Sequence, residues 1–208
     1  MKSRHISQPG ITLTPKTMTE TTEKAADFPI QMGHIMIDIE TWGNGHRSAI
    51  GTIGAVEFDI LTGETGRKFY YNVSLRSCLA MGLEVDADTV LWWMKQPAAS
   101  QAELTKGTST IQDALVKFIW WMNLVGGHSC KVWANGPSFD LVVLGNALRK
   151  ISREEPWKYY NERDVRTMLD LLPKALRKKE NDGQKHHALD DCIHQIGLVV
   201  AARNFVLG

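Results

Sequence analysis

Hydrophobic and polar residues alternate in the part of the chain that follows residue 33. Three stretches carry this strand-like period of two, at residues 34–39, 48–59 and 67–75. Glycine-containing turns separate them, including the sequence LTGETG after the second stretch. Because consecutive strands joined by short turns pair antiparallel, the pattern predicts a three-stranded antiparallel meander.

Helical spacing replaces this alternation in the middle of the chain. The stretch at 109–125 repeats apolar residues on one face and ends before Gly126 and Gly127. Further helices are predicted at residues 86–96, 138–150 and 188–205, with a strand at 131–135 and an extended segment at 157–167. The last helix is apolar almost all round, which predicts that it is buried. A meander followed by alternating helix and strand indicates an α/β domain, whose mixed sheet gains parallel strands and is flanked by helices.

Residues 1–32 differ in composition from the rest of the chain. They are rich in Thr, Ser, Lys and Glu and show no sustained hydrophobic period. They are therefore predicted to form a flexible N-terminal tail ahead of one domain that spans residues 33–208. With 208 residues and 43% hydrophobic content, the chain is long enough for one domain with a sizeable core.

Charge, cysteine content and hydropathy narrow the class of protein. A formal net charge of +1 gives no general attraction to polyanions, so contact with nucleic acid would need a local patch or a metal site. Cys78, Cys130 and Cys192 are odd in number and lack C-x-x-C spacing, which indicates reduced thiols and a cytoplasmic location. The longest apolar runs are too short to span a bilayer, so we expect a soluble protein with no membrane partner.

Two carboxylates end the first predicted strand. Residues two apart on a strand share a face, so Asp38 and Glu40 lie together, opposite Ile37 and Ile39. Neighbouring carboxylates raise each other's pKa unless a cation lies between them, and a divalent metal removes this repulsion. A single D-x-E pair is also expected by chance in a chain that is 23% charged, as solvated acids at a strand end.

Two later segments add acids and a histidine. Asp140 follows the strand at 131–135 at the first turn of a helix, where an α/β sheet commonly builds a site. His186 and Asp191 flank the start of the last, largely apolar helix, where an acid needs a partner to be tolerated. Each also has a structural explanation, because an acid in the first turn of a helix complements the helix dipole and the histidine can be solvated.

Together the motifs point to one family. In chain order they are D-x-E at Asp38 and Glu40, N-x-x-x-F-D at Asn135 to Asp140, and H-x-A-x-x-D at His186 to Asp191. They resemble the DEDDh branch of the DnaQ-like 3′→5′ exonuclease superfamily from about residue 34 to the C-terminus. With RDVRT at residues 163–167, the resemblance is closest to phage and bacterial members of the exonuclease VIII type.

The resemblance implies a fold and a reaction. The fold is ribonuclease-H-like, which agrees with the mixed sheet predicted above. The reaction is hydrolysis of phosphodiester bonds from the 3′ end of nucleic acid, with DNA favoured, and it releases nucleoside 5′-monophosphates. The expected partner is the single-stranded or frayed 3′ end of DNA or RNA, and a homodimer is compatible with the sequence.

The resemblance also implies a two-metal site. Its four carboxylates offer hard oxygen ligands for two divalent ions, Mg²⁺ or Mn²⁺, and no Cys/His cluster with zinc spacing competes. One ion would generate the attacking hydroxide and the other would stabilise the leaving 3′ oxygen. Asp38 would bridge both ions, Glu40 and Asp191 would complete the first site, and Asp140 would hold the second. His186 is the expected general base.

Substrate contacts are expected beside these residues, at Thr41, Trp42, Asn135 and Phe139. Trp42 could stack on a base of the terminal nucleotide, or it could pack at the core or its rim. Neighbours in a helix point about 100° apart, so one tryptophan of each doublet, at residues 92–93 and 120–121, should be buried. Only the other member could stack on a base.

A basic stretch precedes His186. It comprises Lys174, Arg177, Lys178, Lys179 and Lys185. It is interpreted either as a mobile loop that meets phosphates or as an ordinary solvated loop.

Tyr160 and Asp164 have the Y-x-x-x-D spacing with which a sister branch replaces the histidine. We reject this assignment, because the segment is predicted to be extended rather than helical and the choice would leave Asp191 unexplained. Two alternatives stay open. An exoribonuclease that acts on short RNA is not separated from a DNA enzyme, because recognition of the 2′-hydroxyl depends on geometry. A non-catalytic binding domain of the same fold is the second alternative, although it has no need for four clustered acids.

Overall fold

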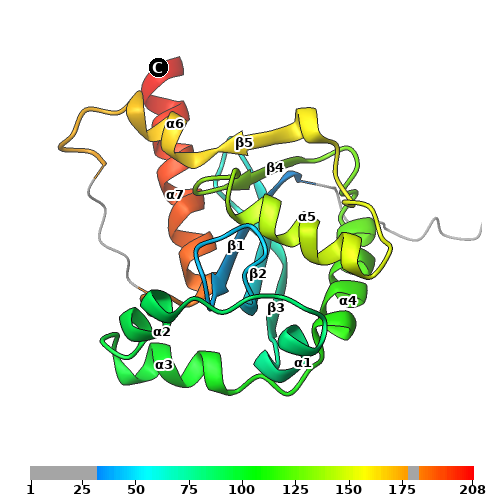
Figure 1. The fold of residues 1–208 in the computed structure, drawn as a ribbon. Helices are drawn as coiled ribbons and strands as arrows, with labels where there is room; N and C mark the ends of the chain where they lie inside the picture. The colour runs from blue at the N-terminus through cyan, green and yellow to red at the C-terminus, as the bar shows by residue number, and fades with distance from the viewer. Residues whose placement is uncertain (1–31, 178–182) are drawn as a thin grey trace, which may run out of the picture. The chain divides into compact units, whose positions relative to one another are not determined.

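A mixed sheet of five strands organises the residues that the computed structural model describes, 32–177 and 183–208 (Figure 1). The strands are β1 (Gly33–Thr41), β2 (Ile50–Asp59), β3 (Thr65–Asn72), β4 (Lys131–Ala134) and β5 (Glu162–Asp164). Their order in the sheet is β3-β2-β1-β4-β5. The first three pair antiparallel, whereas β4 and β5 are added in parallel. The predicted meander with added parallel strands is confirmed.

Helices connect and cover these strands. They are α1 (Leu75–Ala80), α2 (Ala87–Trp93), α3 (Ala98–Thr105), α4 (Ile111–Leu124), α5 (Asp140–Lys150), α6 (Val165–Asp170) and α7 (Ala188–Leu207), with a 3-10 helix at Tyr159–Asn161. The side chain of Asp86 caps α2 by accepting from the Thr89 N–H, and Thr110 caps α4 in the same way.

Several of these helices differ from the prediction. The helices α1 and α3 were not predicted, because six and eight residues are too few to show a clear helical period. The prediction of extended chain at residues 157–167 was wrong at the 3-10 helix Tyr159–Asn161 and from Val165 onward. Asp164 ends β5 and accepts hydrogen bonds from the Arg166 and Thr167 N–H groups, so it starts α6 as an N-cap.

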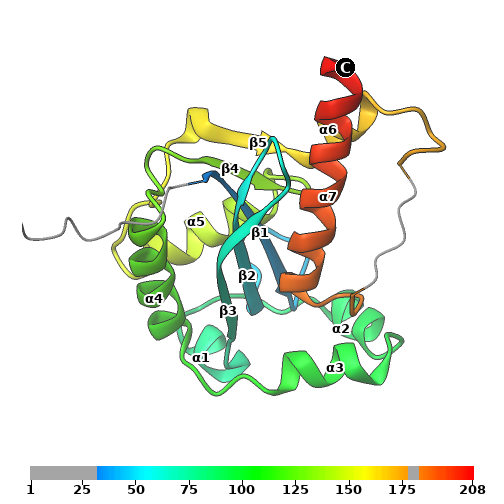
Figure 2. The ribbon, with the colours of Figure 1, turned by 180° about the vertical axis from the view of Figure 1, so that it is seen from behind.

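The two faces of β1 serve two separate cores. Ile35, Ile37 and Ile39 belong to the larger core, which includes buried residues of α4 and α5. Met36 faces the smaller core, which includes Cys192 and other buried residues of α7. Figures 1 and 2 show α5 and α7 on opposite faces of the sheet. The alternation read from the sequence therefore determines which helix each side of β1 meets.

The burial of α7 and of the two tryptophan doublets tests two predictions made from the sequence. The prediction that the helix at 188–205 is buried holds for one side of α7, which includes Cys192, Ile196 and Val199, whereas Ile193 and Phe205 are exposed. One member of each tryptophan doublet is buried, as predicted. Trp93 and Trp121 are buried, whereas Trp92 and Trp120 are exposed.

Several predictions fall on residues outside the described ranges. They concern the tail at residues 1–32, of which only Met32 is described, and Lys178 and Lys179 of the basic stretch. The Met32 N–H donates to Glu57 Oε1 at 3.2 Å. Within residues 32–177 and 183–208, none of the helices combines the length and hydrophobicity that a bilayer span requires.

Candidate active site

The site begins at the carboxyl end of β1, next to the end of β4. Asp38 and Glu40 lie on the β1 face opposite Ile37 and Ile39, as the strand period predicts. The β4 strand runs parallel to β1, so the chain leaves it at the same edge of the sheet. It enters α5 at Asp140, whose Oδ1 accepts a hydrogen bond from the Ile39 N–H at 3.3 Å. This bond holds the third acid beside the first two.

A glycine on β2 allows α7 to bring in the fourth acid. Gly54 pairs with Asp38 across the sheet. A Cβ atom at Gly54 would lie 2.6 Å from the carbonyl carbon of Ala188, far inside normal contact. Because this side chain is absent, the first turn of α7 packs directly against β2. Asp191 in that turn therefore lies close to Asp38 and Glu40.

His187 fixes the start of α7. Its Nδ1 accepts a hydrogen bond from the Asp190 N–H at 3.4 Å, which makes it the N-cap of the helix. Its ring stacks on Tyr70 with 4.5 Å between ring centroids. His187 is thus occupied in positioning α7, and its neighbour His186 faces the acids.

His186 adopts a backbone conformation that is rare for a non-glycine residue, with φ of 57°. Its ring meets the rings of Trp92 and Trp93 edge to face, at centroid distances of 4.9 and 5.7 Å. Trp93 is itself fixed, because its Nε1 donates to the Thr41 carbonyl at 2.8 Å. A strained backbone held by surrounding packing is common at functional sites.

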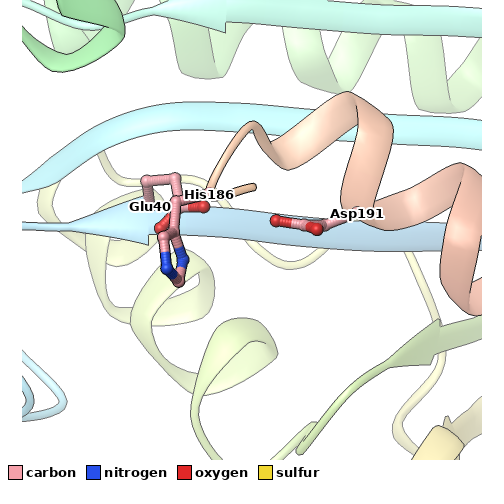
Figure 3. Close-up of side chains that lie close together, drawn as sticks. All are labelled: Glu40, His186 and Asp191. Carbon is pink, nitrogen blue, oxygen red and sulfur yellow. The ribbon is translucent and has the colours of Figure 1, made fainter. Parts of the chain in front are cut away.

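Figure 3 shows how three of the side chains lie. Glu40 comes from β1, His186 from the segment before α7, and Asp191 from the first turn of that helix. One potential ligand atom of each lies within 4.8 Å of the others. The group is therefore compact enough to share one cation.

A cavity of about 470 Å³ contains all four acids and the histidine. The predicted residues that line it are Asp38, Glu40, Asn135, Phe139, Asp140, Lys185, His186 and Asp191. The structure thus brings together residues from three distant segments. Tyr160 and Asp164 do not line it in the described part of the chain, because Tyr160 is exposed and Asp164 caps α6.

Thr41 and Trp42 do not line this cavity among the described residues. The Thr41 hydroxyl donates to the Gly43 carbonyl at 2.6 Å, within the turn that follows β1. Trp42 packs against the larger core. This arrangement favours packing over base stacking for Trp42, and the substrate contacts predicted for both residues stay predictions.

Burial and mutual repulsion disfavour negative charge in this cavity. Burial raises the pKa of Asp38 well above its ordinary value, and Asp140 and Glu40 add to the effect. Burial, with Asp191 and Asp140, raises the pKa of Glu40 to about 8. The pKa of Asp140 rises to about 6, mainly through burial, while the Ile39 N–H and Arg166 oppose the rise. Burial also raises the pKa of Asp191, against the effect of His186 and His194.

Gln195 is a residue of the site that the sequence analysis missed. It lies on α7 four residues after Asp191, and therefore on the same face of the helix. Its Nε2 donates to Asp38 Oδ1 at 2.8 Å. Its Oε1 is buried and has no hydrogen-bond donor among the described residues. A polar residue in a largely apolar helix, on the same face as Asp191, was the signal available in the sequence.

The donor set fits divalent metal ions. Four carboxylates held close together without a compensating cation raise one another's pKa, and a hard cation with oxygen ligands reverses this. The buried oxygen of Gln195 adds an acceptor that a metal-coordinated water could satisfy. The residues present therefore suit Mg²⁺ or Mn²⁺ better than a soft metal.

Comparison with known proteins identifies the family. Residues 33–202 match the family described as "3'-5' exoribonuclease Rv2179c-like domain". The chain belongs to this family. It is a 3′→5′ exonuclease that acts on nucleic acid. A curated relative, the exodeoxyribonuclease of Enterobacteria phage T4, is 26% identical and covers 85% of this chain and 92% of its own length.

Solved structures support the fold. The nuclease domain of 3′hExo, a DEDDh family member bound to rAMP, superposes with a TM-score of 0.53 at 18% identity. The match covers 84% of this chain and 92% of that one. The structure of E. coli exonuclease I in complex with a dT13 oligonucleotide gives a TM-score of 0.55 at 15% identity, over 83% of this chain and 40% of that one. The predicted ribonuclease-H-like fold is confirmed.

Proposed function

We propose that this exonuclease removes nucleotides from the 3′ end of DNA and releases nucleoside 5′-monophosphates at a site that holds two Mg²⁺ or Mn²⁺ ions. The observation that carries the proposal is the convergence of Asp38, Glu40, Asp140 and Asp191 on one cavity, together with His186. Burial raises the pKa of all four carboxyl groups, and repulsion from the neighbouring site carboxylates adds to the rise for Asp38 and Glu40. Divalent cations bound between these carboxylates would neutralise their charge, which explains why the fold places four acids together.

In this proposal Asp38 would be a ligand of both ions, Glu40 and Asp191 would complete one site, and Asp140 would hold the other ion. When bound, the ions would activate a water molecule and stabilise charge on the phosphate and the leaving oxygen. Gln195 holds the Asp38 carboxylate in place through its 2.8 Å hydrogen bond. The bond from the Ile39 N–H does the same for Asp140. These contacts limit the motion of the ligands before substrate arrives.

His186 acts as the general base that accepts a proton from the attacking water. Its position beside Glu40 and Asp191 suits this role, and the rings of Trp92 and Trp93 restrict its rotation. The same proximity would allow His186 to be a metal ligand instead. The two roles separate in a binding assay, because removing a ligand weakens metal affinity and removing a base does not.

Asn135 and Phe139 are the proposed substrate contacts with the strongest support, since both line the cavity. Phe139 offers an aromatic face to a base or sugar, and Asn135 offers hydrogen bonds. Trp92 is a further candidate for stacking, because it is exposed and its ring contacts that of His186. Thr41 and Trp42 remain in the proposal as residues of the turn beside the site.

DNA as the substrate is supported by the name of the phage T4 relative, an exodeoxyribonuclease. The family description, an exoribonuclease, favours RNA as the second candidate. Matched 5′-labelled single strands of one sequence, made as DNA, as RNA and as DNA with one 3′-terminal ribonucleotide, separate the two. The proposal predicts a higher kcat/KM on DNA than on RNA. Faster turnover of the RNA and of the ribonucleotide-ended strand would assign the enzyme to RNA.

Cytoplasmic location and homodimerisation also belong to this proposal. All three cysteines are free and buried, which suits a reducing compartment. Val116, Trp120 and Leu124 are exposed at four-residue spacing along α4, where a second copy could pack. Sedimentation equilibrium would give the mass of the particle in solution.

A further inference from the structure

Arg166 brings a positive charge to the cavity that the four carboxylates line, and Lys185 lines the same cavity. Arg166 is the second residue of α6 and one of the residues that line the cavity. Its backbone N–H donates to Asp164 Oδ1 at 3.1 Å, within the N-cap of the helix. The sequence motif RDVRT contains this arginine, and neither the proposed metal ligands nor the general base accounts for it.

Two neighbours fix the direction of the guanidinium group. Its Nε donates to Asn135 Oδ1 at 3.3 Å. A Cβ atom on Gly136 would lie 3.3 Å from Cζ and from Nη1 of Arg166, so the guanidinium lies against the backbone at this glycine. Gly136 also has φ of 111°, a conformation that favours glycine. The loop after β4 therefore fixes the position of the Arg166 guanidinium group.

The charge of Arg166 has no paired carboxylate. Arg47, Arg67, Arg149 and Arg177 each form an ion pair with an acid, but Arg166 forms none within 4.0 Å among the described residues. Its Nη1 and Nη2 likewise have no hydrogen-bond acceptor in the described part of the chain. Its one marked electrostatic effect is on Asp140, whose pKa it lowers. An arginine whose guanidinium group is held in position, and whose terminal N–H groups lack an acceptor, is suited to bind an anion.

We propose that Arg166 binds the first backbone phosphate upstream of the scissile one, through Nη1 and Nη2. The inference rests on the proposed function. In that function the scissile phosphate occupies the metal site, and the terminal nucleoside ends in a 3′-hydroxyl. Every other phosphate of the strand must therefore lie upstream, and the first of these is the nearest that a cation at the cavity wall can reach. Arg166 and Asn135 together then set how far the strand enters before cleavage.

A double-mutant cycle tests this contact, in which one change removes the arginine and the other removes the charge of the substrate phosphate. The variants are Arg166→Gln, Arg166→Lys and the matched control Arg163→Gln. Arg163 lies three residues earlier, bonds the carbonyls of Tyr160 and Glu162, and does not line the cavity. Each is assayed for release of the first nucleotide from a 5′-labelled single strand. A second strand carries a neutral methylphosphonate at the second linkage from the 3′ end.

The cycle has a definite expected result. Arg166→Gln should raise KM about tenfold on the normal strand and less than about twofold on the methylphosphonate strand, with kcat changed little. Arg166→Lys should raise KM about threefold, because lysine keeps the positive charge but lacks the two parallel N–H donors of the guanidinium group. Arg163→Gln should match wild type on both strands. Equal KM effects of Arg166→Gln on the two strands, or no effect on the normal one, would overturn the contact.

Salt dependence supplies a readout that a purely structural role of Arg166 would not change. Binding of the normal strand is followed by fluorescence anisotropy in a His186→Ala background with Mn²⁺, at several salt concentrations. Loss of one phosphate contact should reduce the slope of log K against log salt by about 0.7. An unchanged slope in Arg166→Gln would refute the contact. If wild type cleaved no nucleic acid at all, the proposed function would fail and this inference with it. If wild type cleaved nucleic acid but the KM effect of Arg166→Gln did not differ between the two strands, this inference alone would be overturned.

Discussion

Replacing Glu40 with glutamine should stabilise the metal-free protein at alkaline pH while it impairs catalysis. Glu40 is buried at the end of β1, and burial with the charges of Asp191 and Asp140 raises its pKa to about 8. A carboxyl group whose pKa is raised in the folded state binds its proton more tightly there than in the unfolded chain. Its contribution to stability is therefore present below the unfolded pKa and is lost as pH rises toward 8.

The size of the effect follows from this shift in pKa. Between 4.5 and about 8, at about 1.36 kcal/mol per pH unit, the free energy of unfolding falls by about 4 kcal/mol as Glu40 ionises. Glutamine does not ionise, although burying an amide with incomplete hydrogen bonds costs about 1–2 kcal/mol. The net gain of Glu40→Gln at pH 8 is then about 2–3 kcal/mol. For a domain of this size that corresponds to roughly 5–10 °C in Tm. At pH 5 the gain should disappear.

Thermal unfolding in the presence of chelator, at pH 5, 6, 7 and 8, measures this difference directly. Glu84→Gln is the control, because Glu84 is exposed and pairs with Arg47 on the surface, where such pairs contribute under about 1 kcal/mol. Added Mn²⁺ should raise the Tm of wild type at pH 8 more than that of Glu40→Gln. A Tm difference between the two proteins that is the same at every pH, or a wild type that gains stability from pH 5 to 8 without metal, would refute the reasoning.

Four further predictions concern the site, and a fifth concerns the N-terminal residues. Asp191→Asn should reduce turnover of a 5′-labelled oligonucleotide at least 10³-fold and weaken Mn²⁺ binding in calorimetry; turnover near wild type would exclude Asp191 as a ligand. His186→Ala should lower kcat by about 10²–10⁴-fold with Mn²⁺ affinity unchanged, and reduced affinity would make it a ligand instead. His187→Ala should lose about 1 kcal/mol in denaturant unfolding, through loss of the N-cap, and keep turnover near wild type; a severe loss of turnover would reverse the roles of the two histidines. Gly54→Ala should lose about 1–3 kcal/mol in the same unfolding assay and also reduce activity, because its Cβ would displace α7. A chain that begins at residue 31 should retain the Tm and turnover of the full chain, and a large drop in Tm would make the preceding residues part of the fold.

The strand pattern determined much of the site because its period is strict. Alternation along β1 correctly placed Asp38 and Glu40 opposite Ile37 and Ile39, and it needed no knowledge of the rest of the fold. The convergence of Asp140 and Asp191 on the same place could not come from local pattern. It depends on β4 running parallel to β1 and on the close approach of α7 to Gly54, which are properties of the whole sheet.

Contacts between side chains of distant segments could not be predicted from the sequence. Gln195 was read as one residue of an apolar helix, but the structure bonds it to Asp38, 157 positions away. The sequence pattern assigns no role to His187, whereas in the structure it caps α7 and stacks on Tyr70. Trp42 could be assigned equally to base stacking or to packing, because the path of the chain after β1 decides which side it faces. Side-chain roles of this kind depend on tertiary neighbours rather than on spacing.

The polarity, product and metal requirement of hydrolysis test the central claim most directly. One single-stranded oligonucleotide, labelled in parallel at its 5′ or its 3′ end, is incubated with the enzyme in Mg²⁺, in Mn²⁺ or in excess chelator. The account predicts that the 5′-labelled strand shortens one nucleotide at a time, that the 3′ label is released at once as a nucleoside 5′-monophosphate, and that chelator stops both. Immediate release of the 5′ label, internal fragments as first products, or full activity in chelator would contradict it.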